Sequence, residues 1–291
     1  MGLVTMNEVL KIAHREGYAV PAFNVCNLEY IQIVVETAAK TNSPVIIAAH
    51  PVEIEYAGLQ ELSYLVRTYA ERVNIPVVLH LDHGDNIERV IKCIKAGFTS
   101  VMYDGSNLDF EDNILKTLRV AEVAHNVGIS VEGELGLVGK AELGEYAHSK
   151  KLNDQKLTDP HMAAEFVKRT NIDSLAVAIG NAHGSYRGIP NIDIERLIAI
   201  HKQANLPLVL HGGSGTPDEV VIKCIKNGIS KINISTDLNL AFYDGIINFI
   251  RQNNGKFGSM ELFTAAKKKA STFILNKFLL FGSLGKAALN K

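Results

Sequence analysis

Three histidines, His83, His183 and His211, follow apolar segments of the chain and have acidic residues beside them. One such histidine alone is more often a buried or loop residue than a ligand, but three beside carboxylates reverse that balance. Three imidazole nitrogens with a free fourth position form a catalytic divalent-metal site, with Zn²⁺ as the first candidate. His80 competes with His83, because successive strand residues face opposite ways and no local signature such as HExxH decides between them. The pattern leaves this choice open.

Two segments rich in glycine and hydroxyl side chains could bind a phosphate. Glycines let backbone N–H groups approach an anion closely, and a helix N-terminus adds a favourable dipole. For either segment alone, a tight turn followed by an ordinary helix cap is the alternative. Together, after the last two predicted strands, they favour phosphate binding. The segments are Gly212, Gly213 and Ser214, and Asn233, Ile234, Ser235 and Thr236.

These residues must be positioned by a regular alternation of strands and helices. Short β-branched runs recur, each followed by an amphipathic segment, which is typical of parallel strands joined by crossover helices. Eight such units predict an α/β fold, a (β/α)8 TIM barrel with parallel strands and a C-terminal helical extension, as one domain over residues 1–291. The expected strands are Ala19–Asn24, Pro44–Ala49, Pro76–Leu81, Ser100–Tyr103, Ile129–Glu134, Ser174–Ile179, Pro207–His211 and Lys231–Ile234; the expected helices include Glu29–Lys40, Leu59–Arg72, Asn86–Lys95, Asn113–His125, Ala163–Arg169, Ile194–Gln203 and Asp218–Lys226.

An internal repeat supports the barrel. Asn74–His80 recurs as Asn205–His211, and Ile91–Gly97 recurs as Ile222–Gly228, both at an offset of 131 positions (205 − 74 and 222 − 91). Two matches at one offset favour a half-barrel repeat over chance similarity between units. A doubly wound sheet is the alternative fold, but its GxGxxG turn is absent after the first expected strand.

The composition excludes several other classes of protein. Hydrophobic residues make up 47% and charged residues 21% of the chain, which indicates a packed globular protein rather than a disordered one. The net charge of −1 gives no basic field for nucleic acid. Apolar stretches are short and no signal peptide is visible, so we expect no membrane association. Three cysteines without a CxxC pair predict reduced thiols and a cytoplasmic location.

Seven motifs follow one another along the chain: Tyr18–Asn24, Leu81–His83, Val131–Gly136, Ala178–Gly184, Leu210–Gly215, Lys231–Thr236 and Phe281–Ser283. In this order they resemble the metal-dependent (class II) ketose-bisphosphate aldolases over essentially the whole chain. Within that family the sequence is similar to both fructose-1,6-bisphosphate and tagatose-1,6-bisphosphate aldolases. The segment Asp173–Gly180 leans toward the tagatose type.

The resemblance implies a lyase, a zinc-dependent enzyme that reversibly cleaves a ketose 1,6-bisphosphate to dihydroxyacetone phosphate and glyceraldehyde 3-phosphate. It implies that His83, His183 and His211 hold the zinc, with Glu134 near enough to support them or to act as an alternative ligand. Asp82 would be the acid and base at the C4 hydroxyl. A monovalent cation (Na⁺ or K⁺) would lie nearby, and the protein would be a homodimer or homotetramer. The implied substrate-binding residues are Asn24, Gly184, Gly212, Gly213, Ser214, Asn233, Ile234, Ser235 and Thr236.

The polar segment Gly136–Asp159 is the longest interruption of the strand–helix pattern, and long loops of this kind are often lids over active sites. The family often carries a run of acidic residues here, of which this chain keeps only Glu142, our candidate for moving the C3 proton. Ser235 stands where fructose-type enzymes frequently carry Asp or Asn, and Arg187 where a lysine is common in some members. The stereochemistry of the sugar therefore stays open.

Rival functions have weaker support in the sequence. A Schiff-base aldolase needs a strand lysine, and Lys231 is expected at the wrong end of the last strand. A zinc hydrolase of the amidohydrolase kind would carry His-x-His on the first strand, where Val20–Cys26 contains no histidine. An aldolase for another phosphorylated ketose and a non-catalytic phosphosugar-binding barrel remain as alternatives.

Overall fold

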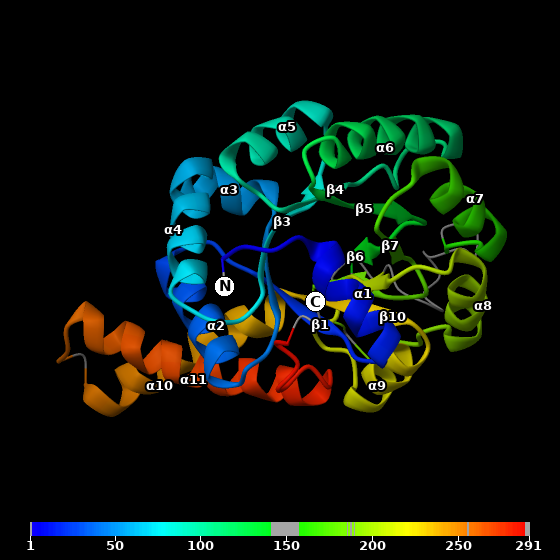
Figure 1. The fold of residues 1–291 in the computed structure, drawn as a ribbon. Helices are drawn as coiled ribbons and strands as arrows, with labels where there is room; N and C mark the ends of the chain where they lie inside the picture. The colour runs from blue at the N-terminus through cyan, green and yellow to red at the C-terminus, as the bar shows by residue number, and fades with distance from the viewer. Residues whose placement is uncertain are drawn as a thin grey trace.

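The computed structural model describes residues 2–140, 157–184, 186, 188, 190–254 and 256–288. Strands and helices alternate along the chain, and the helices surround the strands (Figure 1). The strands are β1 (Val20–Asn24), β2 (Val45–Ala49), β3 (Val77–Gly84), β4 (Ser100–Tyr103), β5 (Ser130–Leu135), β6 (Gly139–Lys140), β7 (Ser174–Val177), β8 (Ala182–His183), β9 (Leu208–Leu210) and β10 (Ile229–Ile234). The helices are α1 (Met6–Glu16), α2 (Leu28–Lys40), α3 (Pro51–Ala57), α4 (Leu59–Glu71), α5 (Ile87–Ala96), α6 (Phe110–His125), α7 (Pro160–Thr170), α8 (Ile194–Ala204), α9 (Asp218–Lys226), α10 (Thr236–Asn253) and α11 (Ser259–Leu280).

Eight of these strands close into a barrel in the order β1-β10-β9-β7-β5-β4-β3-β2, with parallel pairing throughout. The predicted (β/α)8 barrel is confirmed, and all eight expected strand ranges fall on barrel strands. Two strand boundaries differ from the predicted ones and change the place of site residues. Strand β3 runs on to Gly84, so that Asp82 and His83 belong to the strand, and β10 already begins at Ile229, which puts Lys231 inside the strand.

Several helices have one apolar side and a local start and stop signal, and α5 is an example. In α5, the side chain of Asn86 accepts the backbone N–H of Arg89 at 2.8 Å and caps the helix. Gly97, with a φ of 100°, ends it. Between these ends, Val90 and Cys93 are buried against the barrel. Caps and periodicity are local features, which is why the sequence predicts this helix well.

Helix α1 closes the N-terminal end of the barrel, and the sequence pattern did not predict it. Met6 and Leu10 pack with the buried strand residues Val20, Ile46 and Val78 in one apolar cluster. In Figure 1 this blue helix lies across the ring of strands. The polar residues of interest gather instead at the C-terminal ends of the strands, where (β/α)8 barrels carry their chemistry.

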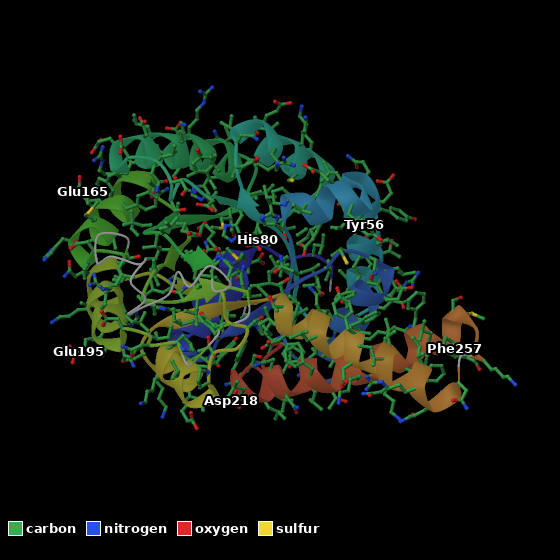
Figure 2. The ribbon with its side chains drawn as sticks, turned by 180° about the vertical axis from the view of Figure 1, so that it is seen from behind. Tyr56, His80, Glu165, Glu195, Asp218 and Phe257 are labelled. Carbon is green, nitrogen blue, oxygen red and sulfur yellow. The ribbon has the colours of Figure 1, made fainter. Side chains whose placement is uncertain are left out.

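Helices α10 and α11 pack against each other as a hairpin that extends beyond the barrel (Figure 1). Phe257, in the connection between them, lies at the far edge of the molecule in Figure 2. The expected C-terminal helical extension is thus confirmed. No helix in the described ranges is long and apolar enough to cross a membrane.

Candidate active site

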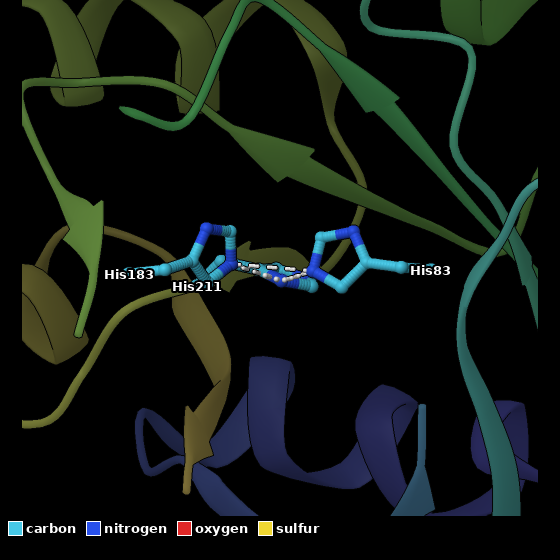
Figure 3. Close-up of side chains that lie close together, drawn as sticks. All are labelled: His83, His183 and His211. Carbon is cyan, nitrogen blue, oxygen red and sulfur yellow. Dashed lines mark hydrogen bonds between the residues drawn. The ribbon is translucent and has the colours of Figure 1, made fainter. Parts of the chain in front are cut away.

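Three histidine side chains converge at the C-terminal end of the barrel (Figure 3): His83 from β3, His183 from β8 and His211 directly after β9. His83 Nε2 lies 3.2 Å from His183 Nε2 and 3.0 Å from His211 Nδ1, and the last two nitrogens are 3.5 Å apart. Three nitrogens bound tetrahedrally to one zinc ion at about 2.0–2.1 Å would be about 3.4 Å from each other. The ring nitrogens therefore have the spacing of a metal site.

The backbone of β3 decides between His83 and His80. His83 has a φ of 49°, in the left-handed region that residues other than glycine rarely adopt. The pairing with β4 shifts register between Leu81 and Gly84, so the regular alternation of side chains stops before His83. His80 stays inside the barrel, fully buried, with Nδ1 2.8 Å from Ser100 Oγ (Figure 2). It is therefore not part of the histidine cluster.

Two carboxylates orient the histidine rings from behind. Asp104 Oδ2 lies 2.8 Å from His83 Nδ1, and Glu132 Oε1 lies 2.9 Å from His211 Nε2. Metal-binding histidines commonly donate their second N–H to a carboxylate in this way, which leaves the facing nitrogen free to bind. Both contacts thus fix the tautomer that a metal site needs.

The charges around the cluster favour a cation at its centre. Burial, together with His83 and His211, lowers the pKa of His183 to about 3, so this ring is neutral near pH 7. Burial acts in the same direction on His83, but Asp82 and Asp104 outweigh it and raise the pKa of His83 to about 10. The acidic side chains around the histidines therefore stabilise a positive charge at this position, which a proton or a metal ion can supply.

Glu134, on β5, lies beside the ring of His83, on the side that faces Asp104. Its Oε2 is buried and has no hydrogen-bond partner among the described residues, although it lies 3.8 Å from His83 Nδ1. Burial, with Asp104 nearby, raises the pKa of Glu134 to about 8. Potential ligand atoms of His83, Asp104 and Glu134 lie within 4.8 Å of one another, as do those of the three histidines. Three imidazole nitrogens with a free fourth position suit zinc, so the histidine cluster fits the expected metal.

Asp82 sits between two amide side chains. Asn24 Nδ2 donates to Asp82 Oδ2 at 3.0 Å, and Asn233 Nδ2 donates to Asp82 Oδ1 at 2.9 Å. Burial would raise the pKa of Asp82, but the neighbouring His83 and His211 hold it well below its usual range. The carboxylate is therefore ionised and oriented, which is the state needed to accept a proton.

Glu132 and Lys231 form a buried ion pair that the sequence analysis did not assign. Lys231 Nζ donates to Glu132 Oε2 at 2.7 Å and lies 3.3 Å from His80 Nε2, and all three side chains are buried. Lys231 lies in the N-terminal half of β10, level with Val20 at the start of β1, and its side chain points into the barrel beneath the histidines. Alternation along β5 could have put Glu132 on the same side as Glu134. Nothing local links it to a lysine 99 positions away.

The two phosphate-loop candidates lie side by side. Gly213 N donates to Asn233 O at 3.1 Å, and Ser214 Oγ accepts from the backbone N–H of Asp237, in the first turn of α10, at 3.2 Å. Together with the histidines and Asp82 they border a cavity of about 1060 Å³. The predicted substrate residues that line it are Asn24, Gly184, Gly212, Ser214, Asn233, Ser235 and Thr236; Gly213 and Ile234 are not part of the lining.

Both ends of the predicted lid segment are anchored beside the site. Strand β6 pairs with β8, in the register Lys140 with His183. At the other end, Thr158 N donates to Ala178 O at 2.9 Å. Glu142 lies outside the described residues, as does most of the segment, so its expected part in proton transfer stays a prediction.

The chain is similar to known aldolases over nearly its whole length. Residues 4–286 match the family model for class-II fructose-bisphosphate aldolase. The fructose-bisphosphate aldolase of Thermus caldophilus is 40% identical, over 98% of this chain and 100% of that protein. The crystal structure of the YdjI aldolase from Escherichia coli K12 is 35% identical, with a TM-score of 0.87 over 98% of this chain and 100% of that one. The fructose-bisphosphate aldolase of Campylobacter jejuni, at 23% identity and a TM-score of 0.83 over 98% and 97% of the chains, shares the fold.

Proposed function

Because the chain belongs to the class II fructose-bisphosphate aldolase family, and is thus a lyase, we propose that it cleaves fructose-1,6- or tagatose-1,6-bisphosphate. The products are dihydroxyacetone phosphate and glyceraldehyde 3-phosphate, and the reaction is reversible. The observation that carries this proposal is the oriented, ionised carboxylate of Asp82 in the same cavity as the three converging histidines. A retro-aldol cleavage needs a base and an electrophilic centre, and a metal ion held by the three histidines would supply the second.

Asp82 moves the proton at C4 in this proposal. It accepts the proton of the C4 hydroxyl as the C3–C4 bond breaks, and it returns a proton to the aldehyde oxygen in the direction of synthesis. The amide donors of Asn24 and Asn233 favour the ionised carboxylate and fix its plane. A base held in one orientation loses less freedom in the transition state.

His83, His183 and His211 would hold a zinc ion, and Glu134, which lies beside His83, would support them or act as an alternative ligand. When bound, the zinc supplies Lewis-acid stabilisation of the negative charge that cleavage leaves on the three-carbon ketone fragment. Glu132 and Lys231 contribute from below: Lys231 neutralises the buried carboxylate, and Glu132 keeps the proton of His211 on Nε2.

The dihydroxyacetone phosphate half would lie on the loops after β9 and β10. Gly212 and Ser214 border the cavity beside the N-terminus of α10, where backbone N–H groups favour an anion. Asn233 Oδ1 is buried without a hydrogen-bond partner among the described residues. This oxygen supports the proposed monovalent cation, Na⁺ or K⁺, beside the phosphate.

A metal-removal experiment tests the proposal. The protein as isolated should cleave fructose-1,6- or tagatose-1,6-bisphosphate in a coupled assay. Comparison of kcat/KM for the two substrates shows which one it prefers. EDTA treatment should abolish the cleavage, and added Zn²⁺ should restore it. Borohydride with substrate should trap no covalent adduct, since the Lys231 ammonium is bound to Glu132. Cleavage that survives EDTA together with a trapped adduct would establish a lysine mechanism, and binding without cleavage of any ketose phosphate would indicate a non-catalytic barrel.

We further propose a homodimer or homotetramer, with α10 in the contact. Four exposed apolar residues, Leu240, Tyr243, Ile247 and Ile250, recur at intervals of three and four on one face of this helix. Such a stripe on a projecting hairpin would be covered by a second copy of the chain.

Light scattering checks this assembly. The wild type should have a mass two or four times 31.8 kDa, and Ile247→Glu should reduce it. Leu115→Glu, at an exposed apolar residue of α6, is the matched control and should leave the mass unchanged. A wild type of 31.8 kDa would contradict the assembly.

The cysteines indicate the cellular compartment of the protein. Cys26, Cys93 and Cys224 are free thiols, which is usual in a reducing compartment, and we infer a cytoplasmic enzyme.

A further inference from the structure

Glu53 makes a hydrogen bond that its place in helix α3 does not require. It stands in the first turn of this helix, where Oε2 accepts the backbone N–H of His50 at 2.7 Å and so caps the helix. The same oxygen also accepts from Asn24 Nδ2, at the end of β1, at 3.1 Å. The cap explains the first contact but not the second, and the side chain of Glu53 borders the cavity.

Asn24 connects Glu53 to Asp82. The amide nitrogen carries two hydrogens, and carboxylate oxygens lie near it on both sides: Asp82 Oδ2 at 3.0 Å and Glu53 Oε2 at 3.1 Å. Glu53 Oε2 already accepts the backbone N–H of His50, and the ionised carboxylate of Asp82 only accepts hydrogen bonds, so a flipped amide would set its own oxygen against an acceptor on each side. Glu53 therefore helps to determine which way the Asn24 amide faces.

We propose that Glu53 is a positioning residue for the carboxylate of Asp82, acting through the amide of Asn24; the inference rests on the proposed role of Asp82 at C4. Asn233 holds Asp82 Oδ1 at 2.9 Å, and Asn24 holds Oδ2. Without Glu53, the amide has one carboxylate acceptor in place of two and can rotate away. Asp82 is then held on one side only, and its orientation for proton transfer is lost.

A double-mutant cycle tests the connection. Glu53→Ala and Asn24→Ala should each lower kcat about 10- to 100-fold, with little change in KM, because the base is misplaced. The double variant should lose no more than Asn24→Ala alone, since Glu53 has no effect once its intermediary is gone. Glu53→Gln should restore most of kcat, because its amide oxygen can accept both N–H groups. Zinc content should stay the same in all four variants.

Glu8→Ala is the matched control for the helix cap. Glu8 caps α1 in the same way, with Oε2 2.7 Å from the backbone nitrogen of Thr5. This variant should lose a similar amount of thermal stability as Glu53→Ala but keep wild-type kcat. Additive losses in the cycle, or an equal loss of kcat in Glu8→Ala, would overturn the inference.

A crystal structure of Glu53→Ala gives a readout that does not depend on activity. The Asn24 amide should have turned away from Asp82. If Asn24 Nδ2 still lies within hydrogen-bond distance of Asp82 Oδ2, the inference fails whatever the enzyme does. If the amide has turned but the wild type cleaves no ketose phosphate, the positioning contact stands and the proposed function fails.

Discussion

Replacement of Asp82 by alanine should lower kcat for carbon–carbon cleavage by about 10²–10⁴-fold, the usual contribution of a positioned acid or base. The side chain is buried among polar partners and accepts hydrogen bonds from Asn24 and Asn233. Asp82→Asn keeps the shape but removes the acceptor for the C4 proton, and it should be equally impaired. Steady-state kinetics on the preferred ketose bisphosphate measures both losses.

Zinc content separates this role from metal binding. Asp82 adjoins His83 without being needed as a ligand, so both variants should retain the wild-type amount of zinc. They should also still exchange the C3 proton of dihydroxyacetone phosphate with solvent, because we assign that proton to another group, with Glu142 as the candidate. A near wild-type rate of cleavage in Asp82→Ala would refute the assignment.

The His211→Ala variant should lose both zinc and activity. This ring supplies one of the three converging nitrogens, and its removal also leaves Glu132 without the hydrogen bond at Oε1. Loss of a residue behind a metal ligand typically costs about 10- to 100-fold in metal affinity, and loss of the ligand itself should cost more. Competition with a chelator of known affinity measures the change.

His125→Ala provides the comparison for His211→Ala. His125 is a partly buried histidine of α6 whose Nε2 lies 2.9 Å from Asp173, outside the proposed site. Its replacement should change neither zinc affinity nor kcat. Full zinc occupancy and activity in His211→Ala would show that the metal, if required, is held elsewhere.

The barrel could be predicted because the sequence patterns of its strands and helices are local. Apolar strand runs such as Val45–Ala49 are buried on both faces, and amphipathic helices follow them at regular intervals. The 131-residue repeat also has a structural counterpart, since β3 and β9 lie four strands apart in the closed order. Helix α1 was not predicted because it precedes the first strand and belongs to none of the eight strand–helix units. It buries the inward-facing side chains at the N-terminal end of the barrel.

The sequence by itself determined the eight-unit barrel and the strand ends at which polar residues gather, and its motifs indicated the family. Only the tertiary structure decided which of those residues meet. His83 joins the cluster in place of His80 because β3 leaves its alternation where it pairs with β4. His83 and His211 meet across 128 positions, and Glu132 finds Lys231 across 99. The periodicity of apolar residues depends only on neighbours in the chain. Closure of the barrel, in contrast, brings together residues that are far apart in the sequence and that no local pattern connects.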